Sequence, residues 1–478
     1  MFRPAAVPGL QDARWPLHPR QLRCADARGA LDLCVRCADG SAGPGGVHCG
    51  RQRRDRWQRG RGEAPLVKRV LVVSYGGAHV AAALPLYAAL RDAGIEPVML
   101  GLTTAADVLR RHGIAGTRFL DHVDITDPHV RRWGDYLCQF HHRDGIGISR
   151  EESVAYLGAS LAELVGEVGE EEALRRYAAQ GLNALLPVKT LQRIIKAERI
   201  DGVIATDSPR AERAALNAAA LLGLPSVCLL TSFPHIGLHY LQRSDNGAVM
   251  CVLNERIKAQ LVAAGRAGDS VRVTGNPAFD ALVTPDADTR RASLRSEARL
   301  APGDWAVLWA EQPEPDNPGL PVEMRERLAD ICARRGWKLI VRLHPSSQAA
   351  TQAVLAEGVL LSPRTESVRD ALLKCDAVVT FTSTIGFEAL VLDKPVVVAT
   401  VSQYSHYVDY REDDGVALAA SLDGVETALA SFHDNDAHAQ QLTRARRAMP
   451  RGGHAARAVV DALAGQSATA ASGTIDAS

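Results

Sequence analysis

The chain has 478 residues, a length that predicts two or three domains, and its 46% apolar content is ordinary for a globular protein. Its 55 basic residues balance its 55 acidic ones, so charge does not point to nucleic acid or a membrane surface as a partner. No apolar run approaches the roughly 20 residues of a membrane span, and no apolar signal segment is visible, which predicts a cytoplasmic protein.

The first 66 residues differ from the rest of the chain. Residues 1–66 contain twelve Arg, no Lys and six acidic residues, with little periodicity, which predicts a disordered, Arg-rich extension. A second interpretation is that natural translation begins near Val67, where the sequence first looks like the start of a Rossmann-type domain. A third is a zinc knuckle, because zinc binds Cys and His side chains, which would be Cys24, Cys34, Cys37, His48 and Cys49.

From Val67 onward, apolar strands alternate with helical patterns, which predicts an α/β protein with parallel sheets. In the first half, residues 67–282, a long helical stretch is expected over 151–199. Strands are expected at 69–75, 95–102, 202–206, 226–233 and 249–254.

The second half, residues 283–464, repeats this alternation. Strands are expected at 305–310, 338–343, 359–362, 377–382 and 396–401. Two Rossmann-like, doubly wound domains in one chain predict a ligand cleft between them, at the carboxyl ends of the strands. The small, polar segment 465–478 is predicted to be a disordered tail. Single cysteines in apolar segments predict reduced, buried thiols at Cys138, Cys228, Cys251, Cys332 and Cys375.

The stretch FTSTIGFEAL, residues 381–390, lies where a strand gives way to a helix. Ser383 and Thr384 would stand at the helix start, where backbone N–H groups and the helix dipole favour an anion. Glu388 follows one turn later and would suit the diol of a ribose. The simpler alternative is a capped helix with a surface glutamate.

RLHPSS ends another strand of the second half. Strand alternation places Arg342 and His344 on one face, which makes them a candidate phosphate clamp. The alternative is a capped turn with a partly buried histidine.

In the first half, the paired glycines Gly76 and Gly77 allow close approach of the backbone to a ligand. His79 follows near the helix start and is a candidate general base. Asp207, after a later strand, is a candidate for the acceptor side by position only. At the junction of the halves, Gly275 and Pro277 indicate a hinge, and Asn276 is expected to cap a turn or to contact the ligand.

Further positions are candidates for the cleft by place alone. His235 follows the strand that ends near residue 233. The cluster His141–Asp144 lacks a third ligand at metal spacing and is read as a solvated loop, so no metal site is predicted.

Together these stretches resemble the GT-B fold of nucleotide-sugar enzymes over about residues 67–460. VTGNPAFDAL, RLHP and TSTIGFEALVLDKPVVV are similar to segments of non-hydrolysing UDP-N-acetylglucosamine 2-epimerases. HP followed by a Ser/Thr motif also resembles capsule and teichoic-acid transferases that use CMP- or CDP-activated donors. SYGGAHV is similar to the glycine-rich loop and histidine of inverting GT-B transferases.

The resemblance implies a first half that binds the acceptor and a second half that binds the donor. His344, Ser383 and Thr384 would hold the donor phosphates with help from Arg342, and Glu388 would hold the ribose. His79 or Asp207 would deprotonate the acceptor hydroxyl. It implies no cofactor and no bound metal, with the nucleotide-activated donor as a substrate.

The expected function is transfer of a sugar or polyol phosphate to a surface-polysaccharide or glycolipid acceptor. A lipid-linked acceptor would bring the enzyme to the inner face of the membrane. A UDP-N-acetylglucosamine 2-epimerase is the second reading, because ATDSPRAE and FPHIGLH replace the acidic segments expected of that family. A non-catalytic nucleotide-sugar-binding subunit is the third.

Overall fold

The computed structural model describes residues 67–143, 147–231, 233–234, 237–314, 316–344, 358–405, 409–434, 437–450 and 452–472. The described residues all belong to one compact unit, Glu63–Ser478. The expectations for residues 1–66, with the zinc alternative, and for His235 lie outside the described residues.

The first sheet has seven parallel strands in the order β3-β2-β1-β4-β5-β6-β7. Its central strands are continuous apolar runs because helices cover both faces of a doubly wound sheet. The strands are β1 Arg69–Ser74, β2 Glu96–Gly101, β3 Gly116–Thr117, β4 Gly202–Thr206, β5 Ser226–Leu229, β6 Val249–Val252 and β7 Val271–Val273. The order of strands reverses direction between β1 and β4, which makes this pair the topological switch point.

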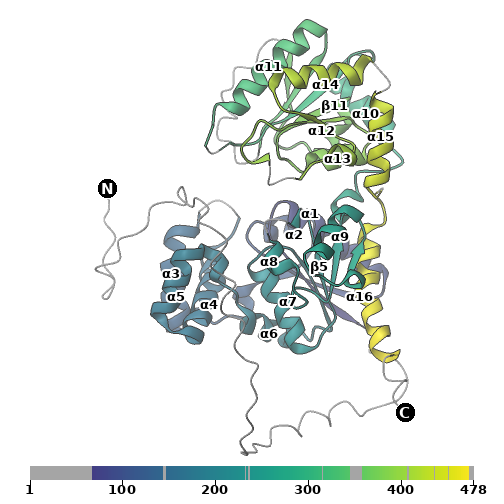
Figure 1. The fold of residues 1–478 in the computed structure, drawn as a ribbon. Helices are drawn as coiled ribbons and strands as arrows, with labels where there is room; N and C mark the ends of the chain where they lie inside the picture. The colour runs from purple at the N-terminus through teal and green to yellow at the C-terminus, as the bar shows by residue number, and fades with distance from the viewer. Residues whose placement is uncertain are drawn as a thin grey trace, which may run out of the picture. The chain divides into compact units, whose positions relative to one another are not determined.

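The second sheet has six parallel strands in the order β10-β9-β8-β11-β12-β13 and follows the same plan (Figure 1). Its strands are β8 Ala306–Ala310, β9 Lys338–Arg342, β10 Val359–Leu361, β11 Ala377–Thr380, β12 Val396–Ala399 and β13 Ala417–Ala419. Here the switch point lies between β8 and β11. The predicted α/β class with two doubly wound sheets is confirmed.

Most helices connect consecutive strands of one sheet. They are α1 Ala78–Asp92, α2 Ala105–Arg111, α7 Ala211–Leu222, α8 Leu238–Leu241, α9 Glu255–Ala263, α11 Leu320–Arg335, α12 Val368–Lys374 and α13 Ile385–Val391. Helix α10, Ala287–Glu297, lies between the last strand of the first sheet and the first strand of the second, and α14 Leu422–Asp434 and α15 Ala437–Ala448 follow the last strand. None of the described helices is long and apolar enough to cross a bilayer.

In the sequence, a separate group of helices follows β3 and precedes β4. It consists of α3 Pro128–His141, α4 Arg150–Val168, α5 Glu170–Gln180 and α6 Val188–Ala197, with the 3₁₀ turn η2 Gly181–Ala184. The expected long helical stretch over 151–199 is confirmed, and it is divided into separate helices because Gly169 and Gly181 interrupt it at φ of 83° and 59°, where other residues are strained. The expectation of a loop from His141 is wrong at its start, since His141 ends α3.

The last helix, α16 Ala455–Ser472, corrects the predicted tail, which was expected to be disordered from residue 465. Figure 1 shows it in yellow beside the first half, where it contacts α1, β5 and β6. Its side chains Val459, Val460 and Leu463 are buried in the core that covers one face of the first sheet. The second half therefore does not extend to residue 464 as expected, because the chain returns to the first sheet.

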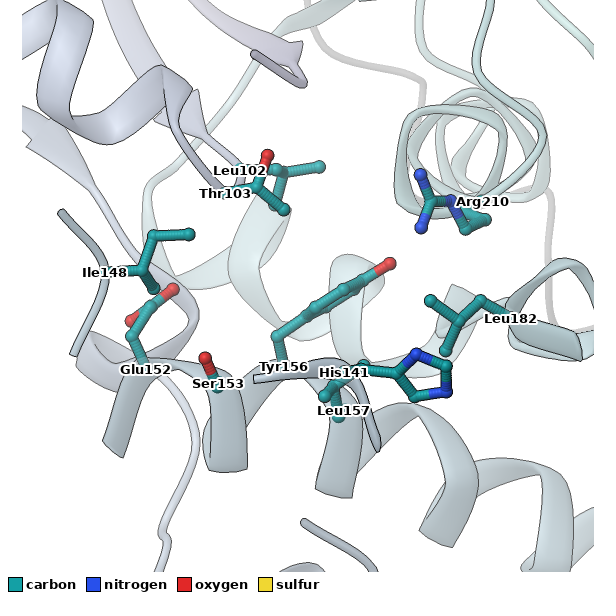
Figure 2. Close-up of a pocket in the computed structure, with 10 residues that line it drawn as sticks. All are labelled: Leu102, Thr103, His141, Ile148, Glu152, Ser153, Tyr156, Leu157, Leu182 and Arg210. Carbon is teal, nitrogen blue, oxygen red and sulfur yellow. The ribbon is translucent and has the colours of Figure 1, made fainter. Parts of the chain in front are cut away.

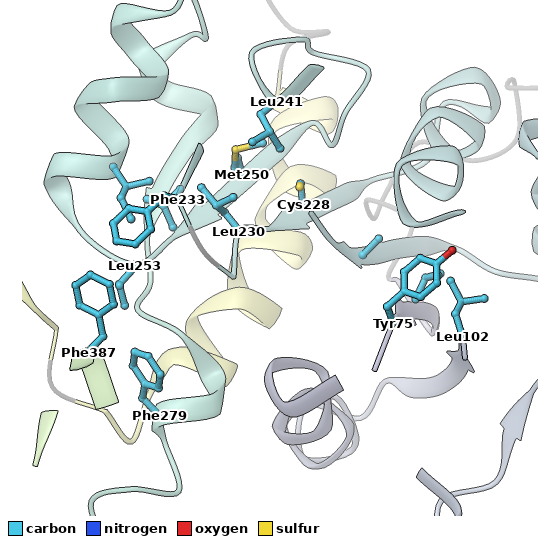
Figure 3. Close-up of a cluster of buried hydrophobic side chains, with 14 of the residues drawn as sticks. Tyr75, Leu102, Cys228, Leu230, Phe233, Leu241, Met250, Leu253, Phe279 and Phe387 are labelled. Atoms are coloured by element: carbon cyan, nitrogen blue, oxygen red, sulfur yellow. The ribbon is translucent and has the colours of Figure 1, made fainter. Parts of the chain in front are cut away.

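The largest core cluster joins side chains of both halves (Figure 3). Phe387 of α13 stacks on Tyr410, with ring centroids 4.5 Å apart, and lies 5.3 Å from the ring of Phe233. Aromatic contacts of this kind add to the free energy gained from burial. The predicted buried, unpaired cysteines are confirmed at Cys138, Cys228, Cys251, Cys332 and Cys375.

Candidate active site

The two switch points gather most of the residues that the sequence singled out. In the first sheet, β1 leads to Gly76, Gly77 and His79, and β4 leads to Asp207. In the second sheet, β11 leads to Ser383 and Thr384. Because ligands of open parallel sheets bind outside the carboxyl ends of strands at switch points, both places are candidates for substrate contacts.

The turn between β11 and α13 is held by hydrogen bonds to Gln312, a residue that was not predicted from the sequence. Gln312, just after β8, accepts the Thr382 N–H at 2.8 Å and donates to the Thr382 hydroxyl at 2.9 Å. Ser383 Oγ accepts the Ile385 N–H at 3.3 Å, whereas Thr384 makes no side-chain capping bond. Gln312 thus fixes the turn, and the Thr384 hydroxyl takes no part in capping the helix.

Glu388 lies one turn into α13 and has an unusual protonation equilibrium. Burial of its carboxyl raises the pKa to about 7, and the charge of Arg342 opposes that rise. Arg342 itself donates to Ser362 Oγ at 2.9 Å and to the Glu366 carbonyl at 3.0 Å. The structure therefore brings Arg342 and Glu388 together, with Arg342 also bracing the segment after β10. His344 follows β9, and partial desolvation of its imidazole lowers its pKa.

The raised pKa of Glu388 makes a prediction about stability. Between about pH 4.5 and pH 7 the folded protein holds a proton on Glu388 that the unfolded chain releases, so stability falls as pH rises through this window. We expect Glu388→Gln to remove this loss and to be more stable than the wild type by roughly 1–3 kcal/mol at pH 8. Urea unfolding of both proteins at pH 5 and pH 8 measures the difference.

The matched control is Glu323→Gln, which changes an exposed glutamate in the first turn of α11. It should unfold like the wild type at both pH values. A pH dependence of Glu388→Gln equal to that of the wild type would contradict the assigned pKa.

In the first half, His79 contacts a buried carboxylate rather than solvent alone. His79 Nδ1 lies 2.9 Å from Thr206 Oγ1, 3.6 Å from Glu212 Oε1 and 3.9 Å from Asp207 Oδ1. Glu212 is completely buried in the first turn of α7, and its Oε1 accepts hydrogen bonds from the Thr206 hydroxyl and the Tyr75 N–H. Burial raises the Glu212 pKa, and the proximity of His79 is the main effect that lowers it.

Asp207 was predicted as a possible base, but one of its carboxylate oxygens already accepts structural hydrogen bonds. Its Oδ1 accepts the N–H of Thr231 at 3.0 Å and the Thr231 hydroxyl at 2.7 Å, which ties the end of β4 to the end of β5. Its Oδ1 is also farther from His79 than Glu212 Oε1 is. The catalytic role of Asp207 stays a prediction, and Glu212 is the carboxylate that sequence reasoning missed.

Comparisons with known proteins agree with this architecture. A structure of UDP-GlcNAc 2-epimerase from Neisseria meningitidis bound to UDP-GlcNAc matches with a TM-score of 0.54 and 15% identity, over 83% of this chain and 99% of that one. An S. aureus MnaA–UDP co-structure gives 0.54 and 16%, over 82% and 95%. MurG from Acinetobacter baumannii gives 0.50 and 15%, over 83% and 99%. At such identities the likeness establishes the fold.

This chain has the GT-B fold. The family model described as UDP-N-acetylglucosamine 2-epimerase matches residues 244–464, a region that begins before β6 and contains the whole second sheet. A search of curated proteins finds no match. The resemblance to GT-B nucleotide-sugar enzymes that the sequence indicated is thereby confirmed.

Gly76 and Gly77 favour glycine for different physical reasons. A Cβ on Gly76 would lie 1.8 Å from Thr104 Oγ1, so this position needs glycine for packing against the loop before α2. Gly77 has a φ of 68° and open space where a Cβ would be, so its left-handed backbone, and not packing, favours glycine there, and its contact with a ligand stays a prediction.

The two residues at the junction of the halves, Gly275 and Asn276, have roles in the local backbone conformation. Asn276 is buried, and its side chain accepts the Ala278 N–H at 3.0 Å to cap a short 3₁₀ turn. Gly275 has a φ of 81°, and a Cβ there would lie 3.4 Å from Ala455 at the start of α16. Asn276 therefore has the capping role, one of its two expected roles, and its contact with a ligand stays a prediction.

Proposed function

We propose that this GT-B protein transfers a sugar or polyol phosphate from a nucleotide-activated donor to a hydroxyl of a glycan or glycolipid acceptor. The observation that carries the proposal is the contact of His79 with Thr206 and the buried Glu212 at the switch point of the first sheet. A histidine oriented through one ring nitrogen by a carboxylate network is the usual arrangement of a general base.

The hydrogen bonds give His79 a defined role. With Nδ1–H donating to Thr206 Oγ1, and the Thr206 hydroxyl donating to Glu212, the lone pair of Nε2 is the basic site. Nε2 would take the proton of the acceptor hydroxyl as that oxygen attacks the donor. The imidazolium that forms would then lie 3.6 Å from the Glu212 carboxylate, whose charge stabilises it.

The donor would bind to the second half. The N–H groups at the start of α13, the Thr384 hydroxyl and His344 would hold its phosphates, and Glu388 would accept a hydrogen bond from the ribose. These groups would stabilise the negative charge that develops on the departing nucleotide. Because two proteins of the same fold bind UDP or UDP-GlcNAc, UDP-sugars are the first donors to try.

The family match over residues 244–464 favours a second candidate, epimerisation of a UDP-hexosamine. The transferase comes first because the protein lacks matches for the acidic segments that the epimerases carry in their first half, and because His79 has an environment suited to a base.

Incubation with UDP-, CMP- and CDP-activated donors, without acceptor and then with a panel of glycan acceptors, separates the two candidates. We expect donor consumption that depends on acceptor and persists in EDTA. Interconversion of a UDP-hexosamine without acceptor would instead establish the epimerase. A melting temperature that none of UMP, CMP, UDP and CDP raises would contradict a nucleotide site of either kind.

A further inference from the structure

A cavity of about 160 Å³ lies between the first sheet and the helical layer α3–α6 (Figure 2). The loop after β2, the end of α3, the body of α4, the turn η2 and the residue before α7 all contribute to its wall. Drug-sized ligands occupy pockets of roughly 300–1,000 Å³, so this one suits a molecule of about one sugar ring.

Arg210 supplies a positive charge to this wall. Its guanidinium lies 4.3 Å from the ring centroid of Tyr75, and no carboxylate of the described part of the chain forms an ion pair with it. The other ionisable lining residue with a carboxyl group, Glu152, accepts hydrogen bonds of 3.0 Å from the N–H groups of Phe119 and Leu120, and burial raises its pKa. Within the described lining, Glu152 is therefore held by the backbone, whereas Arg210 has no carboxylate partner.

Thr103, on the opposite side of the cavity from Arg210 in Figure 2, has a strained backbone. Its φ is 53°, in the left-handed region that β-branched residues avoid at a cost of about 1–3 kcal/mol. Such strain persists only where surrounding structure imposes it, and it is concentrated at ligand-binding sites. This is a second observation, independent of charge, that favours a ligand in the cavity.

Hydrogen bonds connect the cavity to the candidate base. The hydroxyl of Tyr156, which lines the cavity, is hydrogen-bonded to the hydroxyl of Tyr75. The backbone N–H of Tyr75 donates to Glu212 at 2.8 Å, and Glu212 lies 3.6 Å from His79. A ligand in the cavity would therefore be next to the residues that orient His79.

We propose that the cavity binds the anionic group of the acceptor, a carboxylate or phosphate on a hydroxylated unit of about one sugar ring. Arg210 pairs with the anion through its planar fork of N–H groups, and the hydroxyls of Tyr156 and Thr103 contact the ring. That the bound anion belongs to the acceptor rests on the proposed transferase function. The presence of an anion site does not depend on that function.

Isothermal titration with glucuronate, glucose 6-phosphate and neutral glucose tests the site directly. We expect at least one of the two anions to bind, and glucose to bind at least tenfold more weakly. The relative strength of glucuronate and glucose 6-phosphate tells which anion the site prefers.

Two variants and one control locate the binding. Arg210→Gln should weaken anion binding at least tenfold, and Leu182→Trp, which fills the cavity from a partly exposed turn, should do the same. Arg131→Gln on the exposed side of α3 is the matched control and should bind like the wild type. Circular dichroism and an unchanged affinity for UDP would show that each variant is folded.

The outcomes separate this proposal from the proposed function. Arg210-dependent anion binding without transfer from any donor would support the site and contradict the transferase. Transfer with no anion binding, or binding that Arg210→Gln and Leu182→Trp leave unchanged, would overturn the site and leave the transferase standing.

Discussion

Replacing His79 with alanine is expected to lower the rate of transfer to an acceptor by about 10²–10⁴-fold, the usual contribution of a general base. The proton of the acceptor hydroxyl would have no recipient, while the donor-binding residues of the second half would be untouched. The affinity for the nucleotide should therefore stay at the wild-type value. Steady-state kinetics with and without acceptor, together with titration of UDP, measure both quantities.

His112→Ala is the control for this experiment, because His112 is exposed at the end of α2 and contacts its own helix at the Val108 carbonyl. It should keep wild-type activity. The positioning role of Glu212 is tested by Glu212→Gln, which should change the pH profile of kcat and lower kcat with little effect on KM. Full activity of His79→Ala would rule out the mechanism proposed for the base.

Replacing Arg256 with alanine is expected to cost about 3–5 kcal/mol of folding stability, as for the loss of one partner of a buried ion pair. Arg256 of α9 binds Asp414 through Nε at 3.0 Å and Nη2 at 2.7 Å, and it binds Asp409 through Nη1 at 2.7 Å. The Asp414 side chain is only 2% exposed, so without Arg256 its negative charge would be buried with no positively charged partner.

Burial already raises the pKa of Asp414, and Arg256 is the main group that opposes this rise. The folded variant should therefore hold a proton on Asp414 at higher pH than the wild type does, which makes the loss of stability smaller in acid. Arg243→Ala removes an exposed pair with Asp245 and should cost no more than about 1 kcal/mol. Urea unfolding at pH 5 and pH 8 that finds equal stability for Arg256→Ala and Arg243→Ala would refute the prediction.

Much of the fold follows from local sequence patterns. Strands such as RVLVVS and AVVT are apolar runs that a sheet covered on both faces requires, and their ends predicted the places where Ser383, Thr384 and His79 lie. The strands β3, β7 and β13 escaped prediction because they have only two or three residues each and are partly exposed.

The missed features depend on contacts between distant residues. In the sequence, Glu212 looks like an ordinary charged residue near a helix start. Its neighbours Ala211, Ala214 and Ala215 are small and apolar, and all three are buried, so Glu212 lies on the inward face of the helix. The sequence after Gly465 looks like a tail, yet it continues a helix whose Val459, Val460 and Leu463 pack in a core of the first sheet. Neither property can be derived from composition, since each depends on which surface the helix meets.

The return of α16 has a consequence for how the protein is made. Gln466 exchanges hydrogen bonds with the backbone of Ser226 in β5, 240 residues earlier. At the ribosome's pace of about 5–20 residues per second, those 240 residues take roughly 12–48 s to synthesise. Throughout that interval the face of the first sheet that Val459 and Leu463 will cover stays open to water and to other chains. The nascent protein is thus most vulnerable to aggregation while its second sheet is being translated, and synthesis of α16 completes its first half.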